Sequence, residues 1–238
     1  MRSLVLLVAA CSFHTHALTG DGGTTSDAAA DTQGSAVDAA IDSPAAPFCN
    51  PADLDLRACF TFDGSVHDGS YYSHGTSTSN VSYTTGHDGQ AAAIGPTSSI
   101  TVDGNVSSFD ISVFTMKMWI KPNSLPAATL RMGLLDSSNR YRLFLQPGGQ
   151  LRCAITGGPD LYSSSHFVQT GVWQRVACTF DGTTTTIYVD GAVAGSVDQA
   201  ATINTASNGL VIGENSPSGD DFDGAIDDLQ LWGSIVAP

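Results

Sequence analysis

The sequence has little positive charge and almost no glutamate. Its 238 residues include 9 lysines and arginines against 23 aspartates and glutamates, and the formal net charge is −14. Such a chain is a poor partner for nucleic acid, because phosphate binding needs clustered lysine and arginine. Glu214 is the only glutamate in the sequence. Glutamate and lysine are strong helix formers, so their scarcity argues against a helical fold.

The sequence also has no apolar run long enough to span a bilayer. The run Leu4–Ala10 follows Arg2 and is too short for a transmembrane helix. It ends in VAAC, which resembles the lipobox of bacterial lipoproteins. On that resemblance residues 1–11 are a signal peptide and Cys11 carries a lipid anchor. The alternative is an ordinary cleaved signal with an incidental cysteine.

The segment after this leader lacks the residues that build a core. Residues 19–47 contain no aromatic side chain, are rich in Ala, Gly, Ser and Thr, and carry spaced aspartates. Such a composition does not offset the entropy of ordering, and like charges keep it extended. We expect residues 12–47 to be a disordered tether on an exported protein. Ser12, rather than aspartate, follows Cys11, which favours the outer membrane and cell surface of a Gram-negative bacterium.

The rest of the chain has no Cys-x-x-Cys pair, the spacing typical of zinc sites. Its four cysteines are Cys49, Cys59, Cys153 and Cys178. An even number in an oxidising compartment implies disulfides, with three possible connectivities. We favour Cys49–Cys59 and Cys153–Cys178, because the second pair lies in two strand-like runs, QLRCAI and QRVACTF, that could be neighbours.

From residue 57 onward no segment shows sustained helical periodicity. Short runs rich in Val, Ile, Thr and aromatic residues alternate with turns of Gly, Asn, Asp and Ser. This pattern predicts an all-β fold, a two-sheet antiparallel β-sandwich or jelly roll. In FTMKMWI, Lys117 and Trp119 share one face, and in VWQRVACTF, Trp173 and Arg175 do the same. The opposite face of the first run holds Phe114, Met116, Met118 and Ile120.

Four stretches resemble, in order, the laminin G-like branch of the concanavalin A-like lectin/glucanase superfamily. They are RACFTFDGSVHDGSYYSHGT, FTMKMWIKP, GVWQRVACTFDGTTTTIYVDGAVAGS and FDGAIDDLQLW. The resemblance covers about residues 57–236. It implies that residues 48–238 form a jelly roll whose last strand pairs near the first. Members of the family are mostly binding modules for sugars or proteins, and many hold one Ca²⁺.

The resemblance also suggests a calcium site. If the ends of the sandwich meet, the loop FDGSVHDGS approaches FDGAIDD, and Asp63, Asp68 and Asp227 could surround one structural Ca²⁺, which takes carboxylate and carbonyl oxygens. In the family the first Asp of I-D-D faces inward, so Asp227 is preferred over Asp228. The alternative is that these Asp-Gly pairs only mark solvated turns.

The sequence does not support catalysis. The glucanase branch uses two glutamates in E-x-D-x-x-E, whereas this chain has only Glu214. It also lacks the G-x-S-x-G motif of hydrolases. We therefore expect that the protein is not an enzyme. The alternative is an enzyme related to glycoside hydrolases or lyases.

The ligand is expected to contact loops rather than strands. Trp119, Trp173 and Trp232 lie in strands that match the family's core, which favours packing over sugar stacking. Aromatic faces suit sugar rings and arginine suits carboxylates. The candidate contact residues are Tyr71, Tyr72, Arg140, Tyr141 and Tyr162. We expect a non-catalytic cell-surface module that binds a polysaccharide, with a protein-binding adhesion domain as the alternative.

Overall fold

The computed structural model describes residues 46–238, apart from 105–106, 139, 199, 204–208 and 216–218. These residues belong to one compact unit, Ala45–Pro238. The expected signal peptide with Cys11, and the expected tether up to residue 45, lie outside the described residues. In the part of the chain that the structure describes, no helix has the length and apolar character needed to cross a membrane.

The described residues form strands joined by turns, with one short 3₁₀ turn, η1 (Pro147–Gly149). The strands are β1 (Leu56–Phe60), β2 (Thr76–Ser79), β3 (Ser82–Thr85), β4 (Gln90–Ile94), β5 (Ser99–Val102), β6 (Phe114–Pro122), β7 (Met132–Ser137), β8 (Tyr141–Leu145), β9 (Leu151–Ile155), β10 (Leu161–Tyr162), β11 (Gln174–Phe180), β12 (Thr184–Val189), β13 (Ala192–Asp198), β14 (Leu210–Ile212) and β15 (Gly224–Trp232). The expectation of an all-β chain is confirmed.

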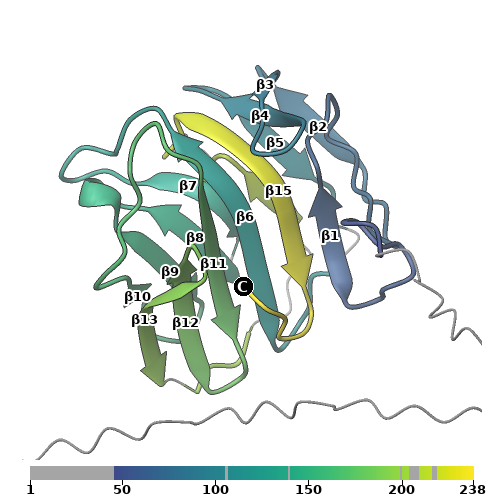
Figure 1. Cartoon of the computed structure of the whole chain (residues 1–238). Coiled ribbons are helices and arrows are strands. Elements are labelled where there is room, and N and C mark those ends of the chain that lie inside the picture. Colours follow the sequence, from purple (N-terminus) through teal and green to yellow (C-terminus); the bar gives the residue numbers. More distant parts are fainter. Residues whose placement is uncertain (1–45, 105–106, 139, 199, 204–208, 216–218) are drawn as a thin grey trace, which may run out of the picture. The chain divides into compact units, whose positions relative to one another are not determined.

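The strands form two antiparallel sheets that pack face to face (Figure 1). The front sheet has the order β13-β12-β11-β6-β15-β4-β3, and β1 also pairs with β15. The back sheet has the order β10-β9-β8-β7-β14-β5-β2. The last strand therefore lies beside the first, as the resemblance implied, and the fold is the two-sheet jelly roll that the sequence predicted.

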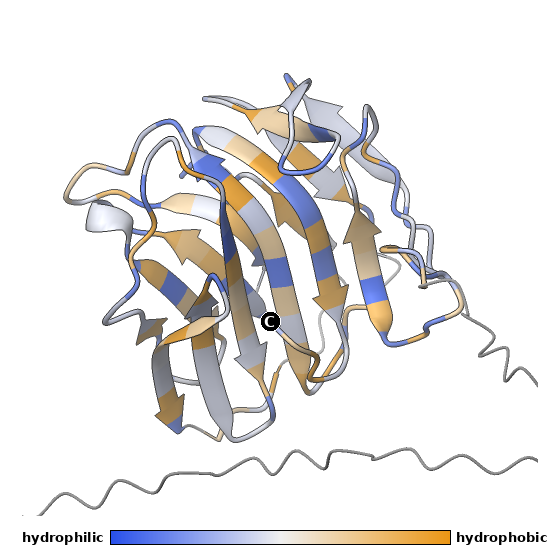
Figure 2. Cartoon of the chain, in the orientation of Figure 1, coloured by the Kyte–Doolittle hydropathy of each residue, from blue (hydrophilic) through white to orange (hydrophobic). Residues whose placement is uncertain are grey.

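The core lies between the two sheets. Met116, Met118 and Ile120 of β6 are buried there, as their alternation predicted, and they belong to the same cluster as Leu143 of β8 and Ile212 of β14. Hydrophobic and hydrophilic residues alternate along β6 and β15 (Figure 2). Because successive side chains point to opposite faces, the polar half of each strand is left on the outer face of the front sheet.

Both disulfides that we favoured are present, Cys49–Cys59 and Cys153–Cys178. The reason given for the second pair was wrong. Cys153 lies on β9 of the back sheet and Cys178 on β11 of the front sheet, so the bond joins the two sheets through the core rather than two neighbouring strands.

Strand β15 is bent where it changes partners. Its first residues pair with β4 and its last residues with β1, while β6 runs along its other side. The register with β6 shifts between Asp227 and Gln230, which marks a β-bulge. Asp228, inside the bulge, has a positive φ of 47°. The bulge places Asp227 opposite Trp119, at the centre of the front sheet.

Candidate functional site

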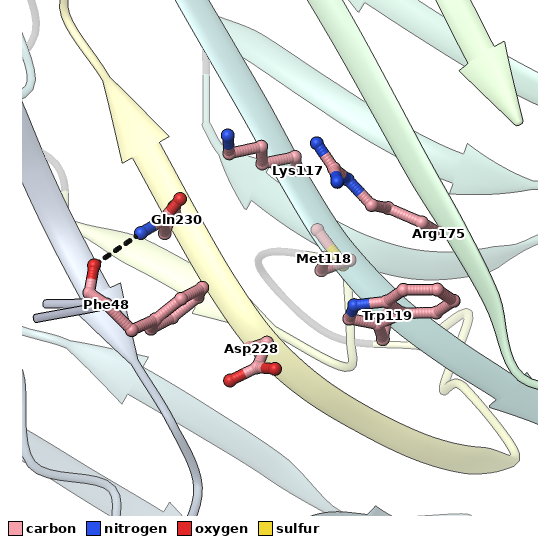
Figure 3. Close-up of a pocket in the computed structure, with 7 residues that line it drawn as sticks. All are labelled: Phe48, Lys117, Met118, Trp119, Arg175, Asp228 and Gln230. Atoms are coloured by element: carbon pink, nitrogen blue, oxygen red, sulfur yellow. Dashed lines mark hydrogen bonds between the residues drawn. The ribbon is translucent and has the colours of Figure 1, made fainter. Parts of the chain in front are cut away.

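A hollow of about 200 Å³ lies on the outer face of the front sheet, over β6, β11 and β15 (Figure 3). Its lining residues come from three strands and from the segment before β1: Phe48, Lys117, Met118, Trp119, Arg175, Asp228 and Gln230. They combine two aromatic rings, two cations, a carboxylate and an amide. Such a mixture of apolar surface and a few polar groups is typical of a small-ligand site.

The alternation of side chains between the two faces of each strand explains why these residues meet on the outer face of the front sheet. Lys117 and Trp119 point outward because Met116, Met118 and Ile120 point into the core. In the register between β6 and β11, Arg175 lies opposite Trp119. The preference for Trp119, Trp173 and Trp232 as core residues was wrong. All three are partly exposed and do not belong to the core cluster. Each lies at a position of its strand or turn from which the side chain points away from the core.

Trp119 is held in place by His87, from the turn between β3 and β4. The two rings stack at 3.6 Å between centroids, with an interplanar angle of 11°. His87 also meets Trp173 edge-on at 6.5 Å. The His87 ring thus covers one face of the Trp119 indole and fixes its orientation, while the same indole lines the hollow.

The turn that carries His87 is fastened by two of the aspartates proposed as calcium ligands. Asp227 is buried, and one of its carboxylate oxygens accepts hydrogen bonds from the backbone N–H groups of His87 (2.8 Å) and Asp88 (3.2 Å). Asp63 accepts a hydrogen bond from the N–H of Gln90 at 2.7 Å. These carboxylates therefore bind backbone donors of one turn.

Asp68 lies in a different environment. Its buried carboxylate accepts hydrogen bonds from the N–H groups of Cys59 and Ser70, and it is 2.5 Å from Nδ1 of His74. Burial raises its pKa, but the hydrogen bonds from His74, Ser70 and Cys59 outweigh burial and hold the pKa below its ordinary value.

The structure does not gather Asp63, Asp68 and Asp227 into a cage. Among the described residues, no group of three or more His, Cys, Asp or Glu side chains is placed to hold a metal ion. The carboxylate oxygens expected to meet Ca²⁺ meet protein donors instead. The three residues as placed do not fit a shared calcium ion, so that part of the sequence interpretation is corrected.

Asp228 is the acidic group that does line the hollow. Burial, and then the nearby carboxylates of Asp227, Asp88 and Asp63, raise its pKa to about 7. Burial likewise raises the pKa of Asp227, against the opposing effect of its backbone hydrogen bonds. Asp227 is fully buried and Asp228 partly exposed. Asp227 lies opposite Trp119 and is hydrogen-bonded to the turn between β3 and β4.

One wall of the hollow comes from the segment before β1. The side-chain amide of Gln230 donates a hydrogen bond to the carbonyl of Phe48 at 2.7 Å (Figure 3). Trp232 donates its indole N–H to the carbonyl oxygen of the same amide at 3.3 Å. The disulfide Cys49–Cys59 fastens the residue next to Phe48 to β1. This cross-link keeps the Phe48 ring at the site.

The two cations of the hollow lie next to each other and face backbone oxygens. Lys117 donates to the carbonyl of Ala237 at 2.8 Å, and Arg175 donates to the backbone oxygens of Ala237 and Pro238. Neither cation forms an ion pair with an aspartate or glutamate of the described residues. Partial burial lowers the pKa of Lys117, and the neighbouring charge of Arg175 lowers it further.

The five predicted contact residues are not brought together, and two of them cannot meet a ligand. Arg140 is fully buried and pairs with Asp110 at 2.9 Å. Tyr141 is also fully buried, donates to the carbonyl of Phe109, and has a pKa raised by burial. They were assigned to a loop, whereas Tyr141 begins β8 and points into the core.

The other three tyrosines lie at the surface but outside the hollow. Tyr71 is 62% exposed and Tyr162 is 43% exposed. Tyr72 is partly buried, and its hydroxyl donates to the carbonyl of Leu54 and accepts from Arg57. Tyr71 has the largest exposed fraction of the three, and its ring meets that of Tyr72 rather than any residue that lines the hollow.

A second hollow lies at the rim of the sandwich, where the segment after β6 meets residues 220–223. It measures about 340 Å³ and its apolar wall includes Leu125, Pro126 and Leu130, the last of which is 58% exposed. Asp220, which borders it, is paired with Arg131 at 2.6 Å. This rim is more apolar than the hollow over the front sheet.

Some residues that line the hollow show a recognisable pattern in the sequence, but the predicted ligand contacts were chosen from loops instead. Alternation placed Lys117 with Trp119, and Trp173 with Arg175, on one face of each strand, but it did not identify that face as exposed. The structure shows that all four side chains are partly exposed. Their meeting depends on the pairing of β6 with β11, which alternation does not give. Phe48 and Asp228 carried no local signal, because a disulfide and a bulge place them.

Comparison with known proteins agrees with this fold. Residues 94–237 match the family model described as the concanavalin A-like lectin/glucanases superfamily. Among curated proteins, no similar sequence was found.

Several solved structures share the fold at low sequence identity. One is domain 4 of AbnA, an extracellular GH43 arabinanase from Geobacillus stearothermophilus, in complex with arabinotriose, with a TM-score of 0.61, 20% identity and coverage of 75% of this chain and 92% of that one.

Two toxin structures are also similar. The binding domain of Paraclostridial Mosquitocidal Protein 1 has a TM-score of 0.62 and 15% identity over 77% of this chain and 50% of that one. Botulinum neurotoxin type C, whose cell entry depends on interaction with two ganglioside molecules, has a TM-score of 0.58 and 12% identity over 76% and 48%. This chain spans about half the length of these two toxin chains.

Proposed function

Because the chain belongs to the concanavalin A-like lectin/glucanase superfamily, we propose that it is a glycan-binding module whose binding surface is the hollow on the outer face of the front sheet. The observation that carries this proposal is the indole of Trp119, fixed by its stack with His87 and lining the hollow. An immobilised aromatic ring offers apolar surface to a sugar ring at little entropic cost.

The other lining groups suit the rest of a sugar. Hydroxyl groups need donors and acceptors, which Gln230, Asp228, Lys117 and Arg175 supply around the indole. The volume of about 200 Å³ lies below the range of drug-sized pockets, so the hollow suits one unit of a longer chain. The arabinotriose complex and the ganglioside dependence of two structural neighbours support a glycan ligand.

We propose binding without catalysis. Glycoside hydrolysis needs two carboxyl groups on either side of the scissile bond. In the described hollow only Asp228 supplies a carboxylate to the lining, and its neighbour Asp227 is buried against backbone N–H groups.

We also propose that the module is displayed at the cell surface. Support for this comes from the sequence alone, from the lipobox-like VAAC with Cys11 and from the composition of residues 12–47. Such a tether would hold the binding face away from the membrane.

The proposal is tested by affinity gel electrophoresis of the protein against arabinan, xylan, β-glucan, methyl-esterified pectin, polygalacturonate and heparin. We expect at least one polysaccharide to retard the protein. The Trp119→Ala variant should weaken this interaction about tenfold, because one aromatic platform contributes on the order of 1 kcal/mol or more.

Tyr71→Ala is the matched control, since it removes an aromatic ring that is 62% exposed and lies outside the hollow. Its retardation should equal that of the unmodified protein. No retardation by any polysaccharide, or full retardation of the Trp119→Ala variant with an unchanged melting temperature, would refute the proposed site.

A further inference from the structure

The positive charges of this protein are distributed unevenly. Four arginines of the described residues, Arg57, Arg131, Arg140 and Arg152, each pair with an aspartate. Lys117 and Arg175, like Lys121 and Arg142, form no ion pair with an aspartate or glutamate of the described residues, although the sequence is rich in aspartate. What distinguishes Lys117 and Arg175 is that they lie side by side on one hollow (Figure 3). Two like charges held together on one face repel each other unless an anion joins them.

The hydrogen bonds of this pair show what kind of group fits between the two side chains. Lys117 and Arg175 converge on the backbone oxygens of Ala237 and Pro238, two consecutive acceptors that stand in for the oxygens of a ligand. The Ala237 carbonyl is a neutral acceptor, and it meets both cations. A ligand carboxylate or sulfate offers several oxygens on one group together with full negative charge, and it forms stronger hydrogen bonds with cationic donors than a carbonyl does.

Lys117 and Arg175 also lie close enough to Trp119 to contact a sugar bound at the proposed site. Lys117, Arg175 and Trp119 line the same hollow, and Figure 3 shows the two cationic side chains next to each other beside the indole. A sugar unit that stacks on Trp119 would therefore bring a substituent within reach of both cations.

We infer that Lys117 and Arg175 form an anion subsite that accepts the carboxylate or sulfate of an acidic sugar in place of the backbone oxygens of Ala237 and Pro238. This inference rests on the proposed glycan function and names its substrate class. Acidic glycans are preferred over neutral ones, and the segment that contains Ala237 and Pro238 is displaced when they bind.

The test is isothermal titration calorimetry of the protein with trigalacturonic acid, with its methyl ester, and with a heparin-derived tetrasaccharide, at physiological ionic strength. Under these conditions charges beyond about 8 Å are screened, so the net negative charge of the protein has little influence. We expect at least one acidic probe to bind about tenfold more tightly than the neutral ester, since a charged acceptor forms stronger hydrogen bonds with cationic donors than an ester carbonyl does. Preference for trigalacturonic acid assigns a carboxylate ligand, and preference for the heparin fragment assigns a sulfate.

Two variants and a control locate the effect. Arg175→Gln and Lys117→Met should each remove the preference for the acidic probe, so that each variant binds the acidic probe and the ester with about equal affinity. Arg142→Gln, on β8 of the back sheet, removes the same charge at a distant position and should change no affinity more than about twofold. Deletion of Ala237 and Pro238 should tighten acidic binding, because the anion no longer displaces the segment.

The outcomes separate this inference from the function on which it rests. Equal affinity for the acidic probes and the ester, no effect of Arg175→Gln and Lys117→Met, or no gain on deleting Ala237 and Pro238 would overturn the subsite. If Trp119→Ala still weakens binding of a neutral polysaccharide, the proposed function stands without the anion subsite. If Trp119→Ala binds every probe undiminished, the proposed function fails as well.

Discussion

Asp228 lies in the bulge of β15 with three other carboxylates nearby. Burial and repulsion by Asp227, Asp88 and Asp63 raise its pKa to about 7. In an unfolded chain the same group titrates near pH 4. The folded state therefore binds this proton more tightly, and ionising Asp228 costs stability. That cost is absent below about pH 4, grows as the pH rises toward 7, and is constant above it.

Asp228→Asn removes this cost. Asparagine also tolerates the positive φ of 47° at this position. We expect the variant to be more stable than the unmodified protein at pH 8 by about 1 kcal/mol, because partial exposure of the side chain screens the repulsion. At pH 4 the two proteins should be equally stable.

Urea unfolding at pH 4, 6 and 8 measures the difference. Asp198→Asn, at the exposed end of β13, serves as the control and should show no such pH dependence. A stability gain at pH 4 as large as at pH 8 would mean that ionisation of Asp228 is not its cause.

At the residue scale, alternation predicted which side chains of β6 and β11 face outward, but not what they do there. The sequence assigned Trp119 to packing because it lies in a strand, whereas its outward phase places it at the surface. Tyr141 was predicted to lie in a loop and to contact the ligand, whereas it begins β8 and is buried. The face of a residue follows from its neighbours along the strand, and its role depends on the strand beside it.

At the scale of elements, aspartates fasten turns to strands. Asp227 of β15 and Asp63 of the segment after β1 both bind the turn between β3 and β4. Gly89 in this turn has a φ of 53°, and a Cβ there would collide with the carboxylate of Asp63. The Asp-Gly pairs that suggested calcium thus have a structural explanation, in which backbone N–H groups take the place of the cation.

This arrangement predicts that metal chelators do not change the thermal stability of the protein. Since Asp63, Asp68 and Asp227 each accept hydrogen bonds from protein donors, adding EDTA should leave the melting temperature unchanged within about 1 °C, because a ligand stabilises a protein only if it binds the folded state. Differential scanning calorimetry with EDTA, and again with excess Ca²⁺, measures this. A lower melting temperature in EDTA that Ca²⁺ restores would show that these carboxylates hold a cation after all.

Three short strands were not predicted from the sequence: β2, β3 and the two-residue β10. The segments of β2 and β3, TSTS and SYTT, are largely exposed and contain almost no apolar residue. Because neither segment has a buried face, neither shows alternation of hydrophobicity, and the sequence alone predicts a long polar loop there. They form strands because β5 and β4 offer free edges with which they pair.

At the scale of the whole molecule, the sequence predicted the sandwich, the meeting of its first and last strands, and both disulfides. The sandwich follows from local patterns of strands and turns, whereas the meeting of the two strands was implied by the family resemblance. The Cys153–Cys178 pairing was predicted for a reason that the structure shows to be wrong. The hollow could not be predicted in the same way. It combines Phe48, Trp119, Arg175 and Gln230, whose convergence depends on strand pairings and a disulfide distant in sequence.

The central claim is that glycan binds beside Trp119 on the front sheet. The most direct test follows the indole N–H signals of the three tryptophans by nuclear magnetic resonance, each assigned with a Trp→Phe variant. The titrant is the oligosaccharide from the polysaccharide that retards the protein most. We predict that the Trp119 signal shifts most strongly. An unmoved Trp119 signal, with shifts instead at the methyl groups of Leu125, Leu130 and Met132 around the rim hollow, would contradict the account.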